Sequence, residues 1–225
     1  QRAARIADGL AAFRARCAEV ESTDAEFDAA MAQSLADLHA LTLPREGRRV
    51  VAAGLPWYAV PFGRDALITA YEALPFAPEL ARDALLFLAA HQGQRDDDET
   101  EEQPGRIAHE LRQGEMATAR EVPHRPYYGT ADATPLFLVL LHEYLQWTDD
   151  RDTIRALLPA ADAALAWLRQ RADLDGDGLL EYERRNPTGL VHQGWKDSTD
   201  GVCFPDGTPC RAPVALLELQ GYAAD

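Results

Sequence analysis

Three observations predict an all-α fold built from helical hairpins. Apolar residues recur at three- and four-residue spacing along most of the 225 residues, which is the period of an amphipathic helix. No segment alternates apolar and polar residues for long enough to predict a sheet. Long connections at 42–64, 93–131 and 172–212 alternate with short ones. Because short connections make neighbouring helices antiparallel, we expect the long connections to gather at one end of the array.

The first expected helices occupy the N-terminal half. Residues 3–17 form a weak, Ala-rich helix, and we interpret 1–22 as a linker helix from an upstream domain. The next helix begins at a capping box made by Thr23 and Glu26, and its apolar face runs through Phe27 to Leu38. The third covers 65–74.

A Pro or an Asp marks the start of three of the remaining helices. Pro78 suits a first helical position, and the helix that it opens runs to Gln92, before Gly93. Asp132 can cap a helix that is apolar on all sides and therefore buried. Another helix covers 154–168, and Pro213 opens the last one.

Composition narrows the possible partners. The net charge of −15 disfavours nucleic acid, whose affinity for proteins comes mostly from Lys and Arg on phosphates, and it disfavours anionic membranes. No apolar run is long enough to span a bilayer. Three cysteines are too few for a disulfide framework, so we expect free thiols and a cytoplasmic protein, although Cys203 and Cys210 flank a turn and can pair.

The first long connection carries aromatic residues before a charged helix start. Trp57 and Tyr58 precede Arg64 and Asp65, and together such groups can stack on and hydrogen-bond a polar ring. The alternative is that Asp65 is only a helix cap, with Arg64 as its ion-pair partner.

The second long connection mixes an acidic run with polar and aromatic residues. The run 96–102 is typical of a solvated tip. Beyond it, His109 and Glu110 can act as acid or base, but their spacing is not that of zinc ligands. Tyr128 precedes Asp132 and forms either a second wall for a sugar or part of a packed turn.

The third long connection holds the most specific signal. Residues 173–178 place Asp at alternate positions before Gly, as calcium loops do, but Arg184 stands where the bidentate Glu is expected. We therefore favour a tight turn there and expect no metal site. In the segment 193–198, Trp195 offers a flat apolar face beside Lys196, and the carboxylate of Asp197 can handle a proton.

Six strings, in this order and at this approximate spacing, resemble the amylo-α-1,6-glucosidase (glycogen debranching) family of the six-hairpin glycosidase superfamily. They are Gly-Leu-Pro-Trp-Tyr (54–58), Phe-Gly-Arg-Asp (62–65), Pro-Gly-Arg-Ile-Ala-His-Glu (104–110), Pro-Tyr-Tyr-Gly-Thr-Ala-Asp-Ala-Thr-Pro-Leu-Phe (126–137), Asp-Gly-Asp-Gly with Glu-Tyr (175–182) and Gln-Gly-Trp-Lys-Asp-Ser (193–198). The similarity runs from Thr23 to the end. Tyr58, Arg106 and Val214 depart mildly from the residues usual in that family.

The resemblance implies an (α/α)6 toroid of helical hairpins, of which 23–225 would be the N-terminal portion. It implies hydrolysis of α-glucosidic bonds in α-glucan or related oligosaccharides with inversion, without a cofactor. Asp197 would be the general acid, and the base would lie beyond residue 225, so the chain alone would be inactive. The implied substrate-binding residues are Trp57, Arg64, Asp65, Glu110, Tyr128, Asp132, Trp195 and Lys196. The remainder of the catalytic domain, or a second copy, would cover the open half of the toroid.

Two other classes of function compete with a hydrolase. A non-catalytic carbohydrate-binding or scaffold module can use the same residues without turnover. A helical scaffold for protein contacts alone has no need for Trp, Tyr and carboxylates concentrated in its long connections.

Overall fold

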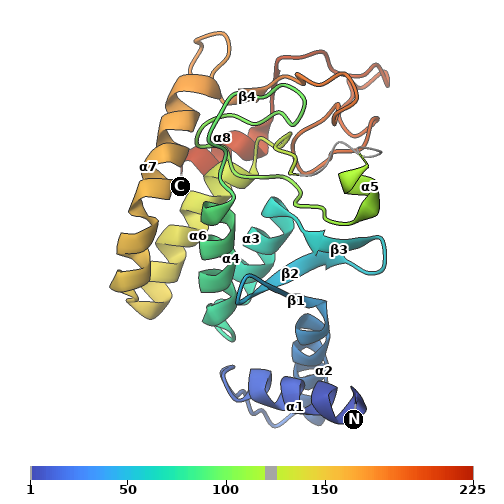
Figure 1. Ribbon diagram of the computed structural model, residues 1–225, viewed down its shortest axis with the longest axis vertical. Helices are drawn as coiled ribbons and strands as arrows, with labels where there is room; N and C mark the ends of the chain where they lie inside the picture. Colours follow the sequence, from blue (N-terminus) through green and yellow to red (C-terminus); the bar gives the residue numbers. More distant parts are fainter. Residues whose placement is uncertain (1, 120–125, 225) are drawn as a thin grey trace.

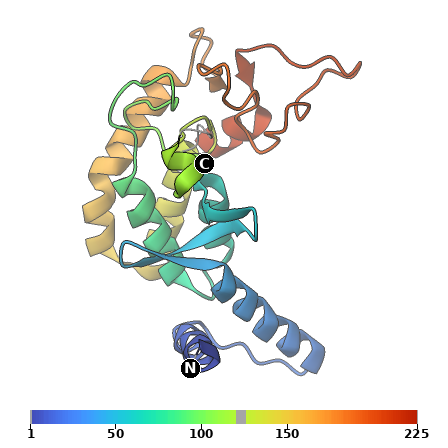
Figure 2. The same ribbon diagram turned by 45° about the vertical axis from the view of Figure 1, so that its right-hand side comes forward.

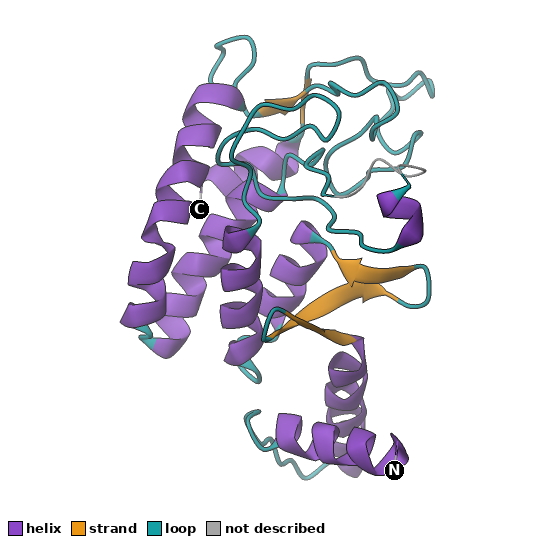
Figure 3. Ribbon diagram, in the orientation of Figure 1, coloured by secondary structure: helices purple, strands orange, loops and turns teal. Residues whose placement is uncertain are grey.

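The molecule combines helices with two small antiparallel sheets (Figures 1 and 3). The structure, a computed structural model, describes residues 2–119 and 126–224. The predicted all-α fold is wrong: the chain is mixed α/β, and the reading of it as part of an (α/α)6 toroid of helical hairpins fails with that prediction.

Two helices form the N-terminal end and pack against the rest of the chain through an apolar cluster that contains Phe13. α1 (Arg2–Arg14) packs on α2 (Ala25–Leu41), with the rings of Phe13 and His39 5.4 Å apart. Figure 2 shows α2 projecting from the sheet, away from the helices that follow the sheet in the sequence. The cap of α2 is Asp24, whose carboxylate accepts hydrogen bonds from two backbone amides of the first turn, so the predicted cap at Thr23 is one residue early.

The larger sheet occupies the first long connection and has the order β1-β2-β3. It consists of β1 (Thr42–Arg45), β2 (Arg48–Gly54) and β3 (Tyr58–Pro61). Glu46 and Gly47 join β1 to β2 with φ values of 50° and 78°, the left-handed pair that a two-residue hairpin turn requires. Because β2 contacts α2, α3 and α4, both of its faces are covered, and its central residues are buried in succession without the alternation expected of a strand.

The core lies among four helices that pack side by side (Figure 1). These are α3 (Gly63–Glu72), α4 (Pro78–Ala90), α6 (Ala133–Thr148) and α7 (Arg151–Arg171). Short connections join α3 to α4 and α6 to α7, as the sequence predicts. The largest fully buried apolar side chains of this core are Leu67, Leu85, Leu88, Ile107, Phe137, Leu140 and Leu157.

Shorter elements complete the fold at the C-terminal side. α5 (Glu115–Thr118) is a single turn within the second long connection. β4 (Glu181–Tyr182) pairs with β5 (Val214–Ala215), directly before α8 (Leu217–Ala224). None of the helices in the described part of the chain combines the length and the hydrophobicity that a membrane crossing needs.

The second and third long connections meet at the end of the molecule where α3 and α6 begin (Figure 1). The amide of Gly63 donates to the carbonyl of His109 over 2.9 Å, and the amide of Ala131 donates to the carbonyl of Gln193 over 2.7 Å. The sequence predicts that all three long connections gather at one end. The second and third meet there with only the end of the first, whose other residues form the sheet, and this meeting determines where the polar residues gather.

Candidate functional site

Arg64 joins three distant parts of the chain. One guanidinium nitrogen donates to Asp132 Oδ2 and to the carbonyl of Gly194, each over 2.7 Å. The other donates to Asp197 Oδ2 over 2.8 Å. We call Arg64, Asp132 and Asp197 the arginine cluster.

Helix starts position two members of this cluster. α3 begins at Gly63 with Phe62 as its cap, so Arg64 lies in the first turn and Asp65 is not the cap residue. Asp132 does occupy the cap position of α6, but its side chain makes no capping hydrogen bond. Its carboxylate binds Arg64 and accepts from the hydroxyl of Thr130 over 2.6 Å instead. The simpler interpretation of Arg64 and Asp65 as a cap with its own ion pair therefore does not describe this site.

The cluster runs from the core to the surface. The exposed fraction is 1% for the Asp132 side chain, 9% for Arg64 and 36% for Asp197. No hydrogen bond from residues 2–119 or 126–224 reaches Asp197 Oδ1. The other carboxylate oxygen, Oδ2, is held by the guanidinium.

Electrostatics couple a third carboxylate to the cluster. Burial acts to lower the pKa of Arg64, but the charges of Asp132 and Asp197 outweigh it and raise the pKa, so Arg64 is a permanent cation. Burial raises the pKa of Asp65; Arg64 opposes this rise, and the charges of Asp197 and Asp132 add to it. Asp65 therefore takes up a proton more readily than a solvated aspartate.

We expect Asp65→Asn to stabilise the fold near neutral pH and to change it little in acid. Because the folded pKa lies above the ordinary value of 3.8, Asp65 favours folding at low pH, and that contribution is lost as the pH rises through the folded pKa. Asparagine carries no charge at any pH. Thermal denaturation between about pH 3 and pH 7 measures the difference, with exposed Asp162→Asn as the control. A gain that stays constant with pH would contradict the burial of this carboxyl.

The predicted tryptophans lie at the surface. Trp195 is 71% exposed, and its amide donates to Glu218 Oε1 over 3.1 Å. Lys196 is exposed next to it. Trp195 is two residues before Asp197, so its ring lies on the same segment that supplies Asp197 to the arginine cluster. Trp57 is 80% exposed at the turn between β2 and β3.

Two other predicted binding residues are buried in the structure. Tyr128 belongs to the main core, and its hydroxyl donates to the carbonyl of His91 over 2.8 Å. Burial, with a smaller effect of Glu102, raises its pKa to about 12. Glu110 is buried and forms an ion pair with Arg112. Of the two interpretations of Tyr128, the structure favours the packed turn, because its ring face is not on the surface.

The acidic run of the second connection is only partly solvated. Asp96 and Asp98 pair at the surface with Arg171 and Arg185, respectively. Glu101, in contrast, is fully buried, and Glu102 is nearly so. The prediction of a solvated tip is wrong for these two residues. The carboxylate of Glu101 accepts from Gln193 of the third long connection, and that of Glu102 accepts from the backbone amide of Gln94 within the same connection.

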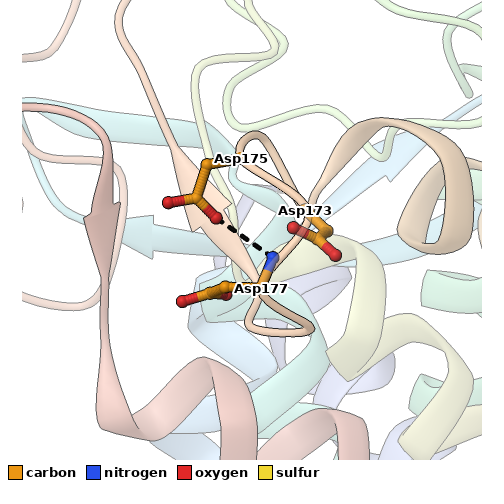
Figure 4. Close-up of side chains that lie close together, drawn as sticks. All are labelled: Asp173, Asp175 and Asp177. Carbon is orange, nitrogen blue, oxygen red and sulfur yellow. Dashed lines mark hydrogen bonds between the residues drawn. The ribbon is translucent and has the colours of Figure 1, made fainter.

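Three aspartates of the third connection are the only described group close enough to share a cation. Ligand oxygens of Asp173, Asp175 and Asp177 lie within 4.8 Å of one another (Figure 4). Asp173 Oδ1 accepts from the amide of Gly176 over 2.7 Å, and Asp175 Oδ1 accepts from the amide of Asp177 over 3.1 Å. These bonds are those of the tight turn that the sequence favours.

Three residues that the sequence did not predict as site residues hold the site together. The carbonyl of Gly194 binds Arg64 directly, and Gln193 and Glu101 hold the segment before it. Gln193 and Gly194 stand at the head of the 193–198 string and Glu101 stands in the acidic run, but these patterns indicated no role for the three residues in the site. The thiols of Cys17, Cys203 and Cys210 are free in the structure.

No protein-family model matches the chain, and a search of the curated proteins finds no match either.

Proposed function

We propose that this chain is part of a glycoside hydrolase of the glycogen-debranching type, acting with inversion on α-glucosidic bonds of α-glucan or related oligosaccharides. The arginine cluster is the observation that carries the proposal. It places a partly exposed carboxylate, Asp197, on a fixed cation, two residues from an exposed tryptophan face. Sugar sites combine such an apolar face with a few polar groups that fix orientation. The resemblance of the six sequence strings supports the same assignment.

Asp197 is the proposed general acid. Its Oδ2 stays on Arg64, and Oδ1 faces the leaving glycosidic oxygen and delivers the proton. Trp195 stacks on a sugar ring, while Arg64, Asp65 and Lys196 bind hydroxyl groups. Inversion needs a second carboxylate about 6.5–9.5 Å away to activate water. We propose that this base lies outside the 225 residues and that the protein acts in the cytoplasm, without a cofactor.

Asp197→Asn tests the assignment. Hydrolysis of maltooligosaccharides and branched dextrins is measured on the protein that includes the second carboxylate. We expect the rate to fall by about 10²- to 10⁴-fold because the amide cannot give a proton to the leaving group. Exposed Asp200→Asn, three residues away, is the control and should retain activity. An Asp197→Asn enzyme as active as the Asp200→Asn enzyme would exclude Asp197 as the acid.

A non-catalytic carbohydrate-binding module is the second candidate function. One observation favours it: Arg64 holds Asp197 Oδ2, and a carboxylate held in this way can accept hydrogen bonds from sugar hydroxyls without any proton transfer. Calorimetric titration of the chain with maltooligosaccharides separates the two functions. Equal binding by the unmodified and Asp197→Asn chains, with no hydrolysis by the protein that includes the second carboxylate, would favour the binding module.

A further inference from the structure

A buried network fixes the segment that carries Asp197. Gln193 Oε1 accepts from Arg106 over 2.6 Å, and Gln193 Nε2 donates to Glu101 Oε2 over 2.6 Å. All three side chains are buried. The amide of Gln193 thus lies between a guanidinium and a carboxylate that come from the second long connection.

The polarity of this amide is determined by its neighbours. A guanidinium only donates hydrogen bonds, and a carboxylate only accepts them, so the oxygen of Gln193 faces Arg106 and its nitrogen faces Glu101. The other carboxylate oxygen of Glu101, Oε1, accepts from the hydroxyl of Tyr127 over 3.1 Å and from the backbone N–H of Asn186 over 3.4 Å. The neighbours therefore determine which end of the Gln193 amide donates a hydrogen bond and which end accepts one.

Gln193 connects the two charged side chains of this network, the guanidinium of Arg106 and the carboxylate of Glu101. Arg106 donates to the backbone carbonyl of Glu101 over 3.1 Å, but its path to the carboxylate passes through the Gln193 amide. Burial lowers the pKa of Arg106 to about 10, and the charge of Glu101 opposes this fall. Arg106 also lies over the Trp167 ring, 5.3 Å from its centroid. The buried positive charge of Arg106 therefore depends on the negative charge of Glu101, to which Gln193 connects it.

The network continues directly into the arginine cluster. The backbone carbonyl of Gln193 accepts from the amide of Ala131, which precedes Asp132. The next carbonyl along the chain, that of Gly194, accepts from Arg64, and Arg64 binds Asp197. The side chain of Gln193 therefore anchors the start of the five-residue segment that ends at Asp197.

We propose that Gln193 is a positioning residue, whose amide links Arg106 to Glu101 and thereby holds Asp197 on Arg64. The consequence for catalysis rests on the proposed role of Asp197, but the positioning itself does not. Gln193→Glu turns the donor nitrogen into an acceptor and places two carboxylates against each other. Glu101→Gln places two donors against each other, because Tyr127 and Asn186 need the oxygen of the new amide. The double substitution restores one donor and one acceptor at the contact between the two side chains and keeps the net charge.

The experiment compares Gln193→Glu, Glu101→Gln and the Glu101→Gln/Gln193→Glu double variant, with exposed Gln146→Glu as the control. We expect each single substitution to lower the melting temperature by roughly 10 °C and the control to change it little. The double variant should recover more than half of either loss. Losses that simply add in the double variant would overturn the proposal. If neither single variant folds, the double variant decides alone, because a double variant that also fails to fold overturns it.

Two further measurements distinguish positioning from general stability. In Gln193→Glu, one proton shared by the two carboxylates relieves their repulsion, so stability relative to the control should improve as the pH falls. Arg106 and Tyr127 face this pair, with Arg185 and Asp132 farther away. Hydrogen exchange should speed up at amides 194–198 more than at amides 84–88 of α4. Uniform acceleration of exchange, or a pH-independent loss, would refute positioning.

Sugar binding then tests the link to function. If the unmodified chain binds maltooligosaccharide, the single variants should lose this affinity and the double variant should regain it. If the double substitution restores stability and hydrogen exchange but the unmodified chain binds no sugar, the proposed function is wrong. The positioning role of Gln193 then still stands.

Discussion

Arg64→Met is expected to lower the free energy of unfolding by about 3–5 kcal/mol, because it leaves the buried carboxylate of Asp132 without its cation. Asp132 is completely buried and keeps only the Thr130 hydroxyl among the described side chains that bind it. Urea denaturation at neutral pH measures the loss.

Two further variants give this prediction its controls. Arg151→Met removes an exposed arginine whose partner, Asp149, is also exposed, so this substitution should change the stability little. Arg64→Met/Asp132→Asn removes the isolated charge together with its partner and should recover part of the loss. An Arg64→Met chain as stable as the Arg151→Met chain would show that Asp132 does not depend on this ion pair.

Gly105→Ala is expected to cost about 2–5 kcal/mol, from backbone strain and overpacking together. The φ value of Gly105 is 87°, in the region that side chains disfavour. An added methyl group would lie 2.1 Å from the carbonyl oxygen of Ala163 and 3.2 Å from Cβ of Trp167. Both neighbours belong to α7, so the backbone of the second long connection would have to move away from that helix.

Gly207→Ala separates strain from overpacking. Its φ value of 83° is close to that of Gly105, but no described atom lies within 4 Å of an added methyl group. We expect a loss of only about 1–2 kcal/mol for this variant. Equal melting temperatures for the two variants would mean that the contact of residue 105 with α7 contributes nothing.

The helices could be predicted because their apolar period survives in the sequence. The sheet could not be predicted, because the burial of β2 removes the alternating pattern typical of a strand. Val50, Val51 and Ala52 are all buried, since helices cover both faces of the strand, and the two-residue period is lost. The turn at Glu46-Gly47 was the available signal, but without an alternating pattern on both sides it did not predict a hairpin.

The site could be predicted in part. Arg64, Asp132 and Asp197 were recognisable from their motifs, and the gathering of the long connections brought them together. Their mutual hydrogen bonds could not be predicted, because the partners are 68 and 133 residues apart in sequence. The burial of Glu101 could not be predicted for the same reason, because its partner Gln193 is 92 residues away in sequence and its charged neighbours indicate a solvent-exposed position.

The separation of these partners also orders events while the protein is made. Arg64 and Asp132 leave the ribosome before Asp197, and synthesis proceeds at roughly 5–20 residues per second. About 3–13 seconds therefore pass in which the guanidinium has one carboxylate and lacks the other. The helices around Asp132 can pack during this interval, whereas the surface carboxylate arrives last and docks onto a cation that is already in place.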